Sequence, residues 1–175
     1  MKKFLITGIP GSGKSTISNV LKTQKYDVID GLRKIGLAYW IDRRTGKETV
    51  YESSVNLDWF REYVWTWDEL VLNKLLKENN EELFFICGVV PLESKILEYF
   101  DKVFLLSIPT ALIRQRIGQK NDNEFTKNPH YINWVLSWHD DFEFRVLKYG
   151  AIPVDTTKPV GEVDDEILSY AQKYK

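Results

Sequence analysis

Cysteine, histidine and excess charge are scarce in this sequence, and each scarcity excludes a class of protein. The 175 residues include one cysteine and two histidines, so neither an internal disulfide nor a cysteine-based zinc site can form. The single cysteine, Cys87, ends the apolar run 83–87 and is expected to be a small buried core residue rather than a reactive thiol. The formal net charge is −1, which does not favour a standing nucleic-acid partner.

Long apolar stretches are missing as well. No run is long enough to cross a bilayer, and the first three residues, Met-Lys-Lys, lead into a strand-like segment instead of a cleavable leader. We therefore predict a cytoplasmic protein without a membrane partner. The length fits one domain spanning residues 1–175 with a full core, and the sequence does not predict the oligomeric state.

A glycine-rich stretch follows the first apolar run of the chain. Residues 8–15, Gly-Ile-Pro-Gly-Ser-Gly-Lys-Ser, fit the pattern G-x-x-x-x-G-K-[ST], which needs a strand before it and a helix after it. The apolar residues 4–6 and the helix-like segment 16–21 provide that context. The stretch is therefore predicted to be a phosphate-binding loop.

Each position of this loop has a task in holding a triphosphate. Glycines at 8, 11 and 13 let the backbone approach phosphate oxygens closely, and the helix that starts near Gly13 adds free N–H groups and the positive end of its dipole. The Lys14 ammonium reaches the β- and γ-phosphates, while the Ser15 hydroxyl is left to bind a metal. We therefore predict ATP and Mg²⁺ as cofactors, with nucleotide contacts from Gly8, Gly11, Ser12, Gly13, Lys14, Ser15 and Thr16.

Short apolar runs alternate with helical patterns along the chain, which predicts an α/β fold: a parallel sheet with helices on both faces. Residues 31–56 have no clear period and are expected to be a loop-dominated insertion, whereas apolar spacing from Leu57 to Leu76 predicts a helix. A later helix is predicted to start at Pro129 with Asn128 as its N-cap and to end before Gly150. Its core-facing side is expected to consist of Tyr131, Trp134, Val135, Trp138, Phe142 and Tyr149. The five strands are expected at 3–7, 26–30, 83–88, 102–107 and 151–154.

Asp30 ends the second predicted strand, at the sheet edge where ligands bind in open α/β folds. Its carboxylate can orient the water shell of Mg²⁺ or accept the proton of a substrate hydroxyl, and the alternative is a turn residue before Gly31. No other apolar run ends in an acid of the Walker B kind. Metal binding is therefore predicted to depend on Ser15, Asp30 and water.

Two arginines precede a polar, non-periodic stretch at 118–128. Arg114 and Arg116 are predicted to close onto the phosphates, because a planar guanidinium can bind two oxygens at once; the alternative is a surface charge on a helix. Lys120 and Lys127 are weaker candidates, since single lysines are usually only solvated. The predicted catalytic residues are thus Lys14, Asp30, Arg114 and Arg116.

The loop, Asp30 and the two arginines together resemble the small P-loop kinases, which include the nucleoside monophosphate kinases and the shikimate-kinase-like enzymes. The resemblance implies a five-stranded parallel sheet in the order 2-3-1-4-5, a substrate-binding region at about 31–68 and a short lid at about 116–128. It also implies transfer of the γ-phosphoryl group of ATP to a small acceptor. By the same resemblance, Thr156, Lys158 and Pro159 lie against the adenine. Leu32, where shikimate kinase has a second aspartate, argues against shikimate as the acceptor.

The acceptor is expected to bind where aromatic and basic residues gather, at 36–68. Trp40 and Arg44, on the presumed loop, are the predicted substrate contacts, while the helically spaced aromatics at 59–67 are expected to pack. A kinase for a nucleoside or nucleotide is favoured. A 5′-end polynucleotide kinase or RNA-processing enzyme, and a non-catalytic ATP-binding regulatory module, remain as alternatives.

Overall fold

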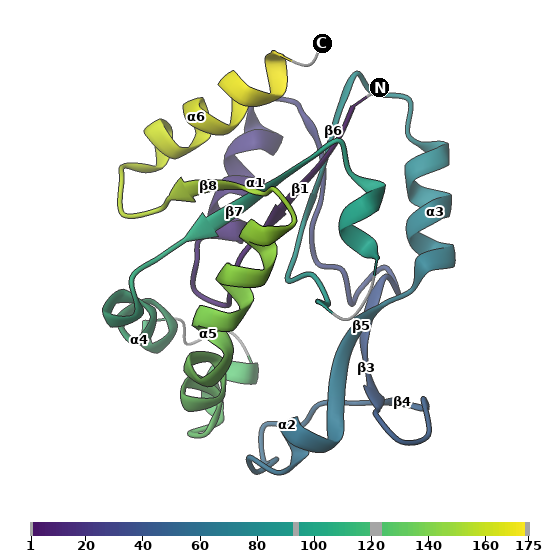
Figure 1. Ribbon diagram of the computed structural model, residues 1–175, viewed down its shortest axis with the longest axis vertical. Coiled ribbons are helices and arrows are strands. Elements are labelled where there is room, and N and C mark those ends of the chain that lie inside the picture. The colour runs from purple at the N-terminus through teal and green to yellow at the C-terminus, as the bar shows by residue number, and fades with distance from the viewer. Residues whose placement is uncertain (1, 93–94, 120–123, 174–175) are drawn as a thin grey trace.

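A five-stranded parallel sheet forms the centre of the computed structural model, which describes residues 2–92, 95–119 and 124–173 (Figure 1). Its strand order is β2-β6-β1-β7-β8, which equals 2-3-1-4-5 when only these five strands are numbered. The predicted strands and their order are therefore confirmed. The strands are β1 (Lys2–Thr7), β2 (Asp27–Ile29), β6 (Leu83–Cys87), β7 (Lys102–Ser107) and β8 (Ile152–Asp155).

Helices cover both faces of this sheet, because alternate apolar side chains along β1 point to opposite faces and each face must be buried. Phe4 and Ile6 belong to the core beneath α1 (Lys14–Thr23) and α6 (Val160–Gln172). Leu5 points to the opposite face, into the core shared with α3 (Glu69–Glu78) and α5 (Tyr131–Lys148). Strands buried on both faces are nearly continuous apolar runs, and this pattern made the central sheet predictable.

A second, smaller sheet occupies the insertion after β2, where only a loop and a helix were predicted. It is antiparallel, in the order β4-β3-β5, and projects from one end of the main sheet (Figure 1). The predicted helix from Leu57 is wrong over residues 63–67, which form a strand, and the predicted loop at 31–56 contains two strands. The elements are β3 (Ala38–Asp42), β4 (Glu48–Thr49), α2 (Trp59–Glu62) and β5 (Tyr63–Trp67).

The composition of β5 explains this correction. Its sequence, Tyr-Val-Trp-Thr-Trp, consists of aromatic and β-branched residues that favour strands, and it pairs along its whole length with β3, where Trp40 lies opposite Trp65. The helix starts again only after Asp68, whose side chain accepts hydrogen bonds from the backbone of Leu70 and Val71. This N-cap separates the strand from α3.

The region between β7 and α5 contains α4 (Thr110–Gly118) and the short 3₁₀ helix η2 (Glu124–Lys127); another 3₁₀ helix, η1 (Ile96–Tyr99), precedes β7. Asn128 is not the N-cap of α5, which begins at Tyr131; instead its Oδ1 accepts from the His130 N–H and its Nδ2 donates to Val55 O at 2.7 Å. Gly150, at φ +87°, follows the end of α5 as predicted. Within the described ranges no helix could span a membrane.

Candidate nucleotide and acceptor site

The glycine-rich loop turns from the end of β1 into α1, and its glycines adopt backbone angles that favour glycine. Gly8, Gly11 and Gly13 have φ values of +152°, +87° and +103°. A Cβ at Gly8 would stand 2.6 Å from Ser12 Oγ and 2.8 Å from Leu106 O, so the loop passes close to β7. At Gly13, by contrast, the described chain places no atom within 4 Å, which leaves open space on this side of the loop.

The Lys14 side chain forms hydrogen bonds with backbone carbonyl groups of the loop itself. Its Nζ donates to Gly8 O at 2.8 Å and Ile9 O at 2.7 Å, and lies 3.4 Å from Ser12 Oγ. The N-cap residue of α1 is Gly13, which has no side chain that could accept a hydrogen bond from the helix. The first backbone N–H groups of α1 therefore have no side-chain cap from this residue. Backbone N–H groups at such a helix start, next to an ammonium group, form an anion-binding arrangement.

The Asp30 side chain interacts with two residues of α1. Its Oδ2 accepts from the Ser18 hydroxyl at 2.6 Å and its Oδ1 pairs with Lys22 Nζ at 2.7 Å. Burial on its own raises the pKa of this carboxyl, but the hydrogen bonds from Lys22 and Ser18 outweigh burial and hold the pKa below its usual value. Since Ser18 lies one helical turn after Ser15, the ionised carboxylate faces the side of α1 that carries the predicted metal ligand.

The donor set suits a hard cation such as Mg²⁺, because both predicted ligands, the Ser15 hydroxyl and the Asp30 carboxylate, offer oxygen. Over the described ranges no group of three or more His, Cys, Asp or Glu side chains gathers to hold a metal. A metal bound here would therefore depend on phosphate oxygens and water for its remaining ligands, as is usual for Mg²⁺.

Arg116 lies beside another predicted nucleotide contact. Its Nη1 is 3.2 Å from Thr156 Oγ1 and its Nη2 donates to Thr156 O at 2.6 Å, while the Thr156 hydroxyl donates to Ser107 O. Arg116 thus joins α4 to the loop after β8. Lys158 in that loop pairs with Glu166 on α6 at 2.9 Å, and Pro159 precedes α6 as its N-cap residue.

Arg114 occupies a different place. Its guanidinium is 3.3 Å from Asn133 Oδ1 on α5, in an exposed position. Of the predicted lid at about 116–128, residues 120–123, and with them Lys120, lie outside the described residues. The described part after them packs onto the insertion, with Phe125 and Tyr51 rings 4.2 Å apart.

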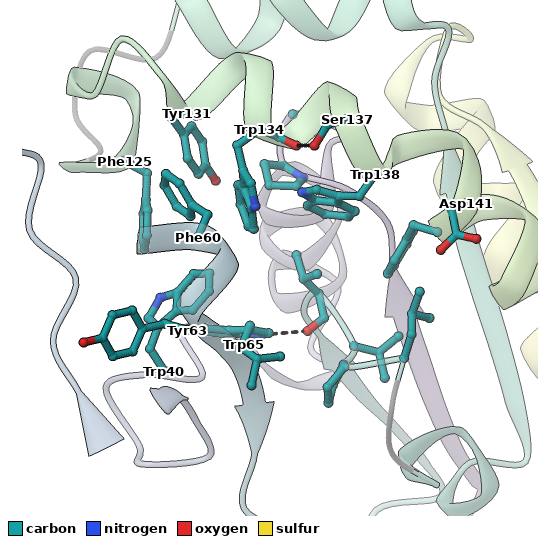
Figure 2. A pocket seen from close by; sticks show the side chains of 18 of the residues that line it. Trp40, Phe60, Tyr63, Trp65, Phe125, Tyr131, Trp134, Ser137, Trp138 and Asp141 are labelled. Carbon is teal, nitrogen blue, oxygen red and sulfur yellow. Dashed lines mark hydrogen bonds between the residues drawn. The ribbon is translucent and has the colours of Figure 1, made fainter. Parts of the chain in front are cut away.

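A cavity of about 750 Å³ starts at the phosphate loop, where Lys14 and Ser15 line it, and continues between the small sheet and α5 (Figure 2). Trp40, a predicted substrate contact, is part of its wall. Arg44 lies in the exposed turn after β3 and is absent from the described lining, whereas Arg43 belongs to it. The aromatic lining consists of Trp40, Phe60, Tyr63, Trp65, Phe125, Tyr131, Trp134, Trp138 and Phe142.

The sequence did not predict the α5 side of this cavity. Trp134 and Trp138 were expected on the core-facing side of this helix; they do pack against the core, but they also line the cavity (Figure 2). The opposite wall is fixed by Val89 O, which accepts hydrogen bonds from the indole N–H groups of both Trp65 and Trp67 at 3.0 Å. These two bonds attach the small sheet to the loop that follows β6.

No protein-family model and no curated protein matches the chain, but solved structures do. A shikimate kinase from Acinetobacter baumannii in complex with shikimate has a TM-score of 0.63 at 16% identity, covering 100% of this chain and 95% of its own. A gluconokinase from Sinorhizobium meliloti has a TM-score of 0.56 at 14% identity, covering 99% and 93%. A deoxyadenosine kinase from M. mycoides with bound dATP has a TM-score of 0.53 at 16% identity, covering 96% and 98%.

These similarities agree with the strand order of the main sheet. At such low identity they establish the fold, which is that of the small P-loop kinases.

Proposed function

We propose that the protein is an ATP-dependent kinase that transfers a phosphoryl group to a small-molecule acceptor bound in the aromatic cavity. The main support is that one cavity of about 750 Å³ joins Lys14 and Ser15 of the phosphate loop to the aromatic walls. A phosphoryl donor on the loop and an acceptor between the walls would share this space. Sites of this kind, concave and largely apolar with a few converging polar groups, are typical of small ligands.

The loop and Lys14 would bind the triphosphate. Phosphate oxygens would replace Gly8 O and Ile9 O, which accept from the Lys14 ammonium at present, and the first N–H groups of α1 would add further donors. Bound Mg²⁺ would neutralise charge on the phosphates, held by the Ser15 hydroxyl and, through water, by Asp30. The dATP-bound deoxyadenosine kinase with the same fold supports a purine nucleotide as ligand.

For Asp30 we favour the role of a metal-shell carboxylate over that of a general base. Both of its oxygens already accept short hydrogen bonds, from Ser18 and Lys22, and its lowered pKa makes it a weak proton acceptor. Phosphoryl transfer needs positioning and charge neutralisation more than proton abstraction. In the step itself, the acceptor oxygen bonds to the γ-phosphorus, the bond to the bridging oxygen breaks, ADP leaves and the hydroxyl proton passes to water.

Arg116 and the loop after β8 are proposed to hold the base end of the nucleotide. Arg116 already contacts Thr156, and Lys158 and Pro159 follow in the same loop. Arg114 stays a candidate for contacting the phosphates. Two neighbours are named for hydroxy-acid acceptors and one for a nucleoside, so the fold alone leaves the acceptor open, and nucleosides or nucleotides remain our predicted class.

A transfer assay tests this function. Protein, γ-labelled ATP and Mg²⁺ are incubated with a metabolite pool, and a labelled product is expected that Lys14→Ala abolishes. ATP binding without transfer to any acceptor would contradict the kinase and favour a regulatory ATP-binding module. Oligonucleotide binding that weakens steeply with salt would favour a polynucleotide kinase.

A further inference from the structure

The chain turns from β7 into α4 just beyond the carboxyl end of the strand (Figure 1). β7 ends at Ser107, and Pro109, two residues later, has no backbone N–H that could extend the pairing with β8. Pro109 is also the N-cap residue of α4, to which it provides no side-chain hydrogen bond. Contacts from neighbouring elements are therefore needed to fix this turn.

Two side chains of α5, one helical turn apart, make such contacts. Glu143 Oε2 accepts from the Ser107 hydroxyl at 2.9 Å, and His139 Nδ1 lies 3.2 Å from Thr110 Oγ1. His139 Nε2 lies 3.1 Å from Glu143 Oε1, and its Nδ1 is also 3.2 Å from the exposed Asp140 carboxylate. Since His139 is only 5% exposed, these bonds form a largely buried polar network, which makes the surrounding backbone rigid.

The end of β7 also holds the loop that follows β8. The N–H and the hydroxyl of Thr156 both donate to Ser107 O, at 3.1 and 3.0 Å. In a parallel ladder the next hydrogen bond would run from the N–H of residue 109 to Thr156 O, but residue 109 is a proline. The Arg116 guanidinium replaces the missing donor, because its Nη2 donates to Thr156 O at 2.6 Å.

Together these contacts form a closed ring of hydrogen bonds that begins and ends on α4. Its members are Arg116, Thr156, Ser107, Glu143, His139 and Thr110. The ring fixes α4 at its first residue and again in its last turn. A groove lined by Thr110, His139 and Glu143 is also lined by Thr157 and Lys158, so the ring lies directly beside the loop after β8.

The α5 members of the ring have no task in the phosphate loop or the acceptor cavity. Neither His139 nor Glu143 is among the described residues that line the aromatic cavity. Hydrophobic side chains could fill this place without the cost of removing polar groups from water. What the polar pair adds is a single defined position for the turn between β7 and α4.

Arg116 and the loop after β8 are proposed above to hold the base of the nucleotide, and on that proposed function rests a further step. We infer that Glu143 and His139 are positioning residues of the base site. Glu143 fixes the end of β7, the end of β7 fixes Thr156, and Thr156 orients the Arg116 guanidinium. Loss of Glu143 would therefore loosen the base site and leave the phosphate loop, which is not part of the ring, unchanged.

Calorimetric titration of the full chain with Mg²⁺ present tests the inference, using a non-hydrolysable ATP analogue and inorganic tripolyphosphate. Tripolyphosphate has no base and reports on the phosphate loop alone. Glu143→Leu is expected to raise the Kd for the ATP analogue about 5- to 30-fold and to change that for tripolyphosphate less than about twofold. An unchanged Kd for the analogue, or an equal rise for both ligands, would overturn the inference.

Further variants separate positioning from a general loss of packing. Glu143→Gln can still bond to both Ser107 and His139, so wild-type affinities are expected; a loss as large as in Glu143→Leu would contradict the hydrogen-bonded ring. Ser107→Ala removes only the hydroxyl and should raise the Kd for the analogue about 2- to 10-fold. It preserves the test if Glu143→Leu does not fold, and an unchanged Kd in it would then refute the positioning role.

A matched control makes the same substitution elsewhere. Glu78 on α3 is 64% exposed and lies 4.0 Å from Lys74, away from the ring. Glu78→Leu should change neither Kd. A rise in the Kd for the ATP analogue equal to that of Glu143→Leu would show that the effect does not come from the ring.

Arg116→Ala distinguishes failure of this inference from failure of the proposed function. It should weaken binding of the ATP analogue but not of tripolyphosphate. If it does so and Glu143→Leu does not, the base site stands and the positioning role is refuted; if neither does, the base binds elsewhere and both are wrong. The expected binding pattern without phosphoryl transfer from labelled ATP would contradict the kinase and leave the positioning role intact.

Discussion

The substitution Gly13→Ala separates phosphate binding from ordinary loop stability. Gly13 has φ +103° and ψ 5°, and Gly46, in the turn after β3, has φ +70°; a Cβ at either position meets no described atom within 4 Å. In both variants alanine costs about 1–2 kcal/mol, because L side chains disfavour positive φ. Urea unfolding should therefore give similar losses of stability for Gly13→Ala and for the control Gly46→Ala.

ATP affinity should distinguish the two variants. Only at Gly13 would the new methyl group occupy the space that a bound phosphate needs. Losing one hydrogen bond to a charged group costs about 1.5–3 kcal/mol, so Kd for ATP should rise about 10- to 150-fold in Gly13→Ala and stay unchanged in Gly46→Ala. Equal ATP affinities in two folded variants, measured by calorimetry with Mg²⁺ present, would refute the phosphate loop.

Other predictions concern single acids and the cysteine. Asp30→Asn should lower kcat more than ATP affinity, and an unchanged kcat would remove Asp30 from the mechanism. Burial raises the pKa of Asp164, whose Oδ2 accepts a hydrogen bond from Gln24. Ionisation of this carboxyl therefore lowers the stability of the folded protein at a pH above its folded-state pKa. Below the pKa of the unfolded chain, about 3.9, the carboxyl is protonated in both states and the stability is unaffected. Asp164→Asn should raise Tm at pH 7 but not near pH 3, and an equal rise at both would contradict this. Burial raises the pKa of Cys87 to about 12, so the thiol should react with a disulfide reagent only after unfolding; fast native reaction would argue against a buried thiol.

The main sheet was predictable because its signals are local. Each strand is a short apolar run, and the phosphate loop is defined by residue types at fixed spacing, so Lys14 and Ser15 could be placed from the sequence. The strand order came from the resemblance to P-loop kinases and is confirmed by the structure.

The small sheet could not be predicted in the same way, because its pairing is not local. Tyr63–Trp67 is a strand through contact with Ala38–Asp42, whose paired residues lie 21 to 29 positions earlier, while its aromatic spacing also fits a helix. A usable signal was present in the turn between β3 and β4. Asp42 Oδ1 accepts from the backbone of Arg44 and Thr45, and Gly46 has positive φ, as expected of a hairpin connection.

The aromatic side of α5 was only partly predictable. Periodicity tells which face of a helix is apolar, but it does not tell whether that face meets a packed core or a cavity. Val135 and Phe142 are buried as expected, whereas Trp134 and Trp138 also line the cavity because the small sheet stands opposite them. Tyr149, predicted on the buried side, is 59% exposed since it follows the end of the helix.

The location of the tryptophans has an optical consequence. All six belong to the small sheet, α2 or α5, and none lies in the layer formed by α1 and α6. Intrinsic emission on excitation near 295 nm therefore comes from one end of the molecule only. A guest ring stacked among these indoles should quench that emission, while a triphosphate at the loop should change it little, so one unlabelled sample distinguishes occupancy of the two ends of the cavity.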